Sequence, residues 1–188
     1  MTTNITTTTA PATPALRETG RRLALAVGLL SIAMAIFQVA VPGTPDGASY
    51  DTFADFTREF LFLGFLLGTI GAVEVARRDR LAPERCSLLI TAGYGLIAIG
   101  VITGLIVREE LDWFFVLAGP GLLLSAVGYI LWAIWAHKSR TVPTWATTLL
   151  AIGGITAIVM SELGASVLIG SFWPYLANKP DDDTERGA

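Results

Sequence analysis

The chain has 188 residues, of which 53% are hydrophobic and 15% are charged, and its formal net charge is −3. Soluble domains carry about 25% charged residues, so this composition excludes an ordinary soluble domain and indicates an integral membrane protein. The single cysteine and single histidine, Cys86 and His137, exclude an intrachain disulfide and a histidine-cluster metal site within one chain. We therefore expect no metal and no other cofactor.

Five apolar runs are long enough to cross a bilayer as helices, which takes about 20 residues each. The first run is longer than the apolar part of a signal peptide, so we expect it to be an uncleaved anchor. The runs are continuous, whereas the strands of a membrane barrel would alternate over about 10 residues. The sequence therefore predicts an all-α integral membrane protein with five transmembrane helices, at about 23–41, 56–76, 87–107, 113–136 and 144–170.

Basic residues accumulate on alternate connections between these runs. Because Lys and Arg are enriched in cytoplasmic loops, this pattern predicts a multi-pass protein of the cytoplasmic membrane, with the N-terminus in the cytoplasm and the C-terminus outside. In this arrangement the inner side carries nine basic and four acidic residues, and the outer side carries four and twelve. Residues 1–20 are predicted to be a disordered cytoplasmic tail, 21–176 the transmembrane bundle, and 177–188 an acidic outer tail.

The second and third runs can be aligned with the fourth and fifth. Arg80 and Pro83 fall on Arg140 and Pro143, and several Gly and Leu positions also match. Such residues are common in membrane helices, so the alignment leaves two readings open, a parallel duplication of one helical hairpin or chance similarity.

Small residues four positions apart recur in the predicted spans. In a membrane, such pairs let helix backbones approach closely. The pairs that we expect to pack helices together are Gly64 and Gly68, Gly100 and Gly104, and Gly153 and Ala157.

Glu162 is the only charged residue between Thr144 and Asn178. A charged side chain within the membrane costs about 2.5–3.5 kcal/mol on insertion scales, and such residues are functional candidates. We place Glu162 in the outer third of the bilayer. Two interpretations remain open, a proton or ligand site and a structural ion pair or hydrogen bond that binds nothing.

Other polar features are expected at the same depth as this carboxylate. Pro120 cannot donate a backbone hydrogen bond, so the helix should kink and leave a carbonyl open one turn earlier. Thr103 is expected at a similar level, and either Arg58 or Arg108 would pair with the carboxylate. These side chains form the predicted polar pocket.

The sequence contains no phosphate-binding Gly-Lys-Ser/Thr loop, no HExxH motif and no CxxC pair. The leading hypothesis is a non-enzymatic accessory or scaffold bundle that acts in the lipid bilayer through a membrane-protein partner or as a homo-oligomer, without nucleic acid. The alternative is a small transporter or a proton- or cation-handling protein that uses Glu162. An integral membrane enzyme has the least support.

Overall fold

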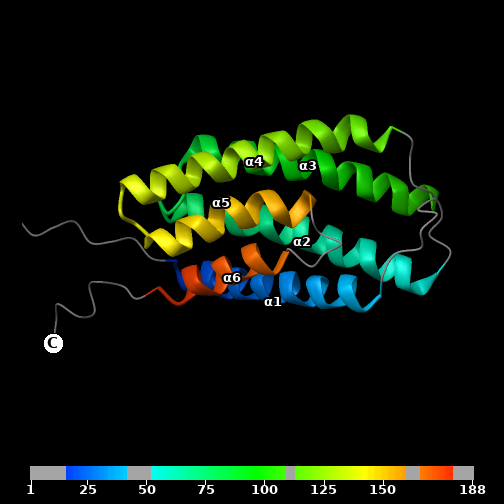
Figure 1. Cartoon of the computed structure of the whole chain (residues 1–188), viewed down its shortest axis with the longest axis horizontal. Coiled ribbons are helices and arrows are strands. Elements are labelled where there is room, and N and C mark those ends of the chain that lie inside the picture. Colours follow the sequence, from blue (N-terminus) through cyan, green and yellow to red (C-terminus); the bar gives the residue numbers. More distant parts are fainter. Residues whose placement is uncertain (1–15, 42–51, 109–112, 160–165, 180–188) are drawn as a thin grey trace, which may run out of the picture.

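A computed structural model describes residues 16–41, 52–108, 113–159 and 166–179, with the side chains of 157–159 left out (Figure 1). All regular structure in these ranges is helical. The six helices are α1 (Glu18–Ala40), α2 (Phe53–Arg78), α3 (Glu84–Val107), α4 (Phe114–Lys138), α5 (Thr144–Val159) and α6 (Ser166–Ala177).

The first four helices are long and apolar enough to cross a membrane, with 23 to 26 residues each. Their bounds lie within a few residues of the first four predicted spans. Each helix packs against the next along the chain, and α6 packs against α1, so the six helices form a closed ring of neighbours. The all-helical membrane class is thus confirmed in its coarse form.

The predicted fifth span at 144–170 is wrong as a single helix, because the structure has two shorter helices there. The 16-residue α5 and the 12-residue α6 run antiparallel. The ring of Trp145, at the start of α5, lies 4.6 Å from that of Tyr175, near the end of α6. Figure 1 shows both helices in the same half of the bundle. Hydropathy did not reveal the break, since both helices are apolar and their combined length is that of one span.

The position of α6 against α1 also corrects the prediction that the chain begins and ends on opposite sides of the bundle. The hydroxyl of Ser166 donates to the backbone carbonyl of Ser31, at 3.1 Å. The guanidinium of Arg21 donates to the side-chain oxygen of Asn178, at 3.2 Å. The last described residues therefore lie at the same end of the bundle as the start of α1. The prediction of opposite ends followed from counting one span where the chain folds back on itself.

We call this end, with the α2–α3 and α4–α5 connections, the basic end, and the end with the start of α2 the opposite end. Of the twelve Lys and Arg residues in the described ranges, ten lie at the basic end and two, Arg58 and Arg108, at the opposite end. The charge asymmetry seen in the sequence is therefore an asymmetry of the folded bundle.

The two connections at the basic end share one backbone geometry. Arg80 and Arg140 both have left-handed φ angles, 60° and 53°. After each arginine, the next amide donates to the carbonyl five residues earlier, at 2.8 and 3.2 Å. This bond is typical of a Schellman ending. Pro83 and Pro143 then directly precede the next helix. The offset of 60 residues is the one that the sequence alignment gave, so the resemblance extends to local structure.

Candidate functional site

The opposite end of α2 is organised around a buried carboxylate, that of Asp55. The Thr52 and Asp55 side chains form a reciprocal capping box, in which each accepts a hydrogen bond from the other's backbone amide. Such a cap satisfies amides that the first helical turn leaves unpaired. The Arg58 guanidinium lies 3.5 Å from the same carboxylate. Arg58 thus has a carboxylate partner on its own helix.

Arg108 comes to the same place from the end of α3. It ends that helix in a left-handed conformation, with φ 64°. Its guanidinium lies 5.9 Å from the centre of the Phe56 ring, within the range of a cation–π contact. Arg58 and Arg108 therefore each contact a residue of the first turn of α2, Asp55 and Phe56 respectively.

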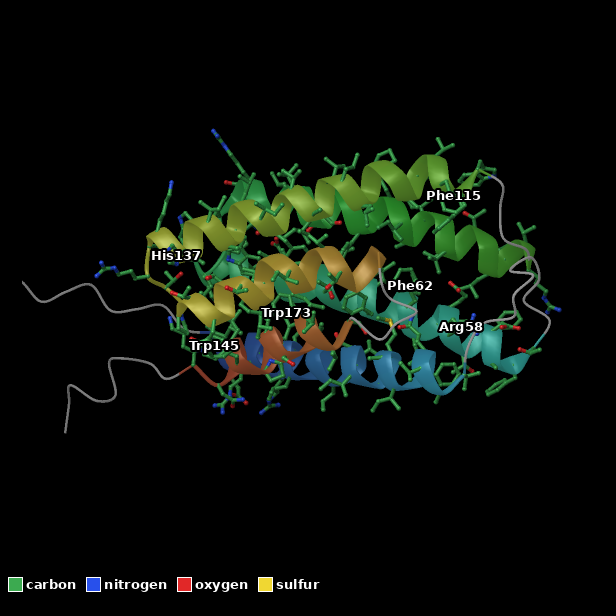
Figure 2. All side chains as sticks on the ribbon, viewed as in Figure 1. Arg58, Phe62, Phe115, His137, Trp145 and Trp173 are labelled. Atoms are coloured by element: carbon green, nitrogen blue, oxygen red, sulfur yellow. The ribbon has the colours of Figure 1, made fainter. Side chains whose placement is uncertain are left out.

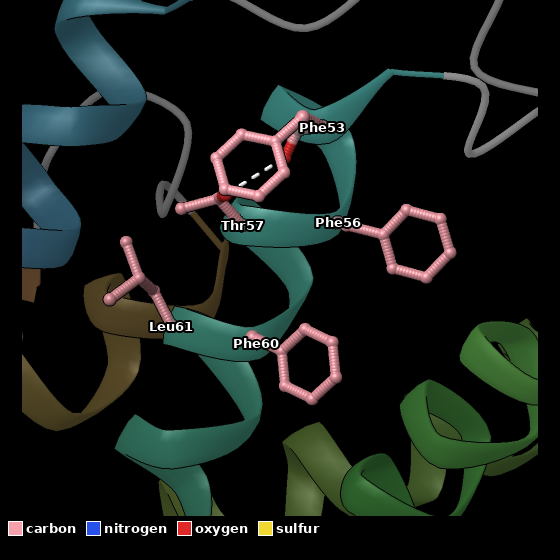
Figure 3. A pocket seen from close by; sticks show the side chains of 5 residues that line it. All are labelled: Phe53, Phe56, Thr57, Phe60 and Leu61. Carbon is pink, nitrogen blue, oxygen red and sulfur yellow. Dashed lines mark hydrogen bonds between the residues drawn. The ribbon is translucent and has the colours of Figure 1, made fainter.

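A shallow apolar groove of about 490 Å³ runs along this part of α2 (Figure 3). Figure 3 shows Phe56 and Phe60 projecting on one side of the helix and Leu61 on another. The Thr57 hydroxyl donates to the carbonyl of Phe53, at 2.8 Å, so the one hydroxyl in the lining is used by the backbone. The groove offers apolar surface and no free polar group of its own.

Thr103 and Pro120 do not lie at one level. Gly121 packs against Ile97 of α3, whereas Thr103 is six residues further toward the opposite end, or about 9 Å along the helix. The Thr103 hydroxyl donates to the carbonyl of Ile99, at 2.8 Å. Pro120 is exposed on α4, which continues through it as one helix. Glu162 lies outside the described residues, so the predicted pocket stays a prediction.

The predicted packing glycines lie at helix contacts. Gly64 and Gly68 face leucine and valine side chains of α1, and the ring of Phe114 lies against Gly100. Gly104 is buried. A Cβ at Gly153 would meet the backbone of α6. The remaining member of the set, Ala157, belongs to α5, but its side chain is not among those described.

A row of buried aromatic side chains crosses the centre of the bundle. The Tyr94 ring lies 6.0 Å from Phe65 of α2 and 6.0 Å from Tyr129 of α4. One turn along α4, Trp132 lies 6.1 Å from Trp173 of α6. All five side chains are at most 1% exposed. The row therefore links four helices.

Several polar atoms in this interior have no hydrogen-bond partner among the described residues. They are Gln38 Oε1, Thr69 Oγ1, Tyr94 OH, Tyr129 OH and Trp173 Nε1. A buried polar group without a partner costs about 1–3 kcal/mol, so native structures rarely retain one without a reason. Hydroxyls of this kind can bind water, a cation or a polar solute. No three His, Cys, Asp or Glu side chains gather in the described residues.

Sequence reasoning missed this interior. Tyr94 and Tyr129 were available as a signal, because tyrosine in membrane helices is enriched at the interfaces and both residues lie near the middle of a span. Only the fold shows that they face each other. Asp55 could also have been recognised, from its spacing to Thr52.

No family model, no curated protein and no solved structure matches the chain.

Proposed function

We propose that the chain is a multi-pass protein of the cytoplasmic membrane with four spanning helices, a half-length hairpin formed by α5 and α6, and both termini in the cytoplasm. The distribution of basic residues supports this topology. With the basic end inside, eleven Lys and Arg residues are cytoplasmic and two are outside, compared with nine and four for the five-span arrangement. The positive-inside rule is thus obeyed more strictly.

Within this topology, we propose that the bundle handles a proton, a small cation or a small polar solute in its interior. The observation that carries the proposal is the pair of fully buried tyrosines, Tyr94 and Tyr129, whose hydroxyls lie close to each other and have no other partner among the described residues. Two half-length helices support it, since transporters often build ion sites where helices stop within the membrane. In the sequence, Glu162 belongs to the six residues between these helices.

The test is flux through the purified protein in liposomes, read with a pH-sensitive dye inside the vesicles and with potassium or sodium gradients outside. Tyr94→Phe and Tyr129→Phe remove only a hydroxyl each, and Glu162→Gln removes only a charge. Thr148→Val is the matched control, because its hydroxyl is exposed and bonds only its own helix. We expect flux with the wild type and the control, and a reduction of at least tenfold in the other three. Equal flux in all five, or none above empty vesicles, would refute the proposal.

The accessory or scaffold role is the second candidate, and the surface of α4 favours it. Only 22% of the apolar 18-residue stretch of α4 is buried inside the bundle, the lowest share of the four long helices. Phe115, Val116 and Leu123 are between 67% and 73% exposed, and a Cβ at Gly119 would meet nothing within 4 Å. A small residue between large apolar ones is the usual surface for packing against another membrane helix.

A mild-detergent purification with mass determination tests this second role. A stable partner or oligomer that is lost in Gly119→Leu and retained in Gly95→Leu would support it, because Gly95 is equally open but lies on α3. A monomer without a partner would exclude it and leave the flux proposal untouched.

A further inference from the structure

The two similar connections at the basic end differ in their charges. Counted at the offset of 60, three of the four basic residues of the first connection recur in the second, whereas Arg85 corresponds to Trp145. The pairs are Arg77 with His137, Arg78 with Lys138, and Arg80 with Arg140. Three acidic residues of the first connection do not recur. Glu74, Asp79 and Glu84 correspond to Ile134, Ser139 and Thr144.

In the first connection, two carboxylates pair with neighbouring basic groups. Glu74 accepts hydrogen bonds from Arg77 at 2.6 and 2.7 Å and from Arg78 at 3.0 Å. Asp79 accepts from the backbone amide of Arg17 at 3.0 Å and lies 3.4 Å from its guanidinium. The first connection is therefore partly compensated by carboxylates of the chain itself, while Arg80 and Arg85 form no ion pair among the described residues.

The second connection has the cations without these partners. Among the described residues no carboxylate forms an ion pair with His137, Lys138 or Arg140. The Ser139 hydroxyl, which stands in the place of a carboxylate, is used by the backbone carbonyl of Trp135, at 2.8 Å. An external anion is the group that would complete this connection as Glu74 and Asp79 complete the first.

A polar pocket of about 630 Å³ lies at this place. Its polar lining comes from the α4–α5 connection and the end of α6, namely His137, Arg140, Thr141, Thr144, Tyr175 and Lys179. The positive end of the α5 dipole points to the same side, since α5 begins at Thr144. Figure 2 shows His137 and Trp145 together at this end of the bundle.

We propose that this pocket binds a phosphate group, carried either by an anionic lipid headgroup or by a free phosphate compound. Phosphate fits because the Arg140 guanidinium forms its strongest hydrogen bonds with such oxygens, and the Thr144 hydroxyl adds a neutral donor. Trp145 is 53% exposed and packs on Tyr175, which is typical of residues at the headgroup level. Basic pockets between helices on the cytoplasmic side are known to take lipid headgroups. The proposal does not depend on conduction through the bundle.

The test uses the purified full chain in detergent. Native mass spectrometry measures retention of phosphatidylglycerol against phosphatidylcholine, and calorimetry measures binding of inorganic phosphate. We expect Arg140→Gln to weaken binding about tenfold, as loss of one charge-assisted contact would. Arg80→Gln is the matched control, because it changes the corresponding arginine of the other connection, which does not line the pocket, and it should leave binding unchanged.

A second variant places the missing carboxylate back. Ser139→Asp places a carboxylate at the position that corresponds to Asp79, between Lys138 and Arg140, and should abolish binding without loss of helical content. Binding of phosphatidylglycerol alone would identify a lipid site, and binding of inorganic phosphate alone a soluble ligand.

Three results would overturn the proposal. The first is the absence of either ligand from the wild type. The second is equal weakening by the Arg80 and Arg140 variants, which would indicate nonspecific attraction. The third is binding that emerges only when Asp181, Asp182 and Asp183 are replaced by Asn, because the acidic tail would then be the occupant.

Discussion

The contact between α5 and α6 is tested most directly at Gly153. A Cβ placed there would lie 2.7 Å from the amide nitrogen of Ile169, and 3.0 and 3.1 Å from the neighbouring backbone atoms of α6. These are backbone atoms, so no side-chain rotation relieves the contact. To reach an ordinary separation of 3.4 Å, the two helices must move apart by about 0.7 Å.

The magnitude follows from two opposing effects of Gly153→Ala. Forcing an additional methyl into a packed contact costs about 1–3 kcal/mol. Alanine in a helix interior recovers about 0.5–1 kcal/mol relative to glycine. Because the contact is with backbone, the cost lies in the upper part of its range, so the net loss in the free energy of unfolding is about 1–2.5 kcal/mol, or about 2–10 °C in Tm for a chain of this length. Gly95→Ala is the control, because a Cβ there meets nothing within 4 Å, and its Tm should stay or rise.

The assay is thermal unfolding in detergent, followed by near-ultraviolet circular dichroism and by size-exclusion recovery after heating. If Gly153→Ala melts at or above the wild type while Gly95→Ala behaves as expected, α5 and α6 do not approach this closely. The returning hairpin, and with it the placement of both ends at the basic end, would then be refuted.

Other parts of the fold give further predictions. Cysteines introduced at Asn178 and at Phe53 should react with a membrane-impermeant reagent from opposite sides of sealed vesicles, since these residues lie at opposite ends of the bundle; labelling from one side would contradict the described topology. Trp132→Phe removes the 2.8 Å bond to the buried carbonyl of Leu81 and should lower the free energy of unfolding by about 1–3 kcal/mol in a denaturant titration, whereas no change would show that the bond is dispensable. Asp55→Ala removes half of the α2 capping box and should cost about 0.5–2 kcal/mol by the same titration, and an unchanged midpoint would show that the cap contributes nothing.

The four long helices could be predicted from the sequence because each is a continuous apolar run with charged residues near its ends. Arg77 and Arg78 end one run, and Lys138 ends another. The orientation of these ends relative to one another was also readable, since basic residues recur after alternate spans. Hydropathy and charge are properties of each run by itself, so they can be read from the sequence without knowledge of tertiary contacts.

The returning hairpin could not be read in the same way. Its two helices together have the length and hydropathy of one span, and the charge at Glu162 had an equally good explanation as a polar group within a continuous helix. What distinguishes the two cases is a contact far apart in sequence, the backbone of α6 against Gly153 and Gly28. Such contacts are fixed by the shape of the assembled bundle rather than by any local pattern.

For the candidate sites, too, the local features could be read from the sequence but the contacts between helices could not. Arg58 or Arg108 was predicted to pair with Glu162, which lies outside the described residues; in the structure Arg58 pairs with Asp55, and Arg108 lies over the ring of Phe56. The buried tyrosines were visible in the sequence only as residues at an unusual depth. Their juxtaposition depends on the packing of α3 against α4.

The two hairpins resemble each other in one half of the bundle and diverge in the other. Gly93 and Gly153 correspond at the offset of 60, and each receives the backbone of the helix that follows it. Beyond this glycine, α3 continues for 14 residues to Val107, whereas α5 ends after six, at Val159. Helices that end within a membrane need protein partners for their terminal backbone groups. The bond from Ser166 to the carbonyl of Ser31 joins the first turn of α6 to the middle of α1. The shorter hairpin is therefore held by its long neighbours α4 and α1, and its return places Trp173 of α6 at the end of the buried aromatic row.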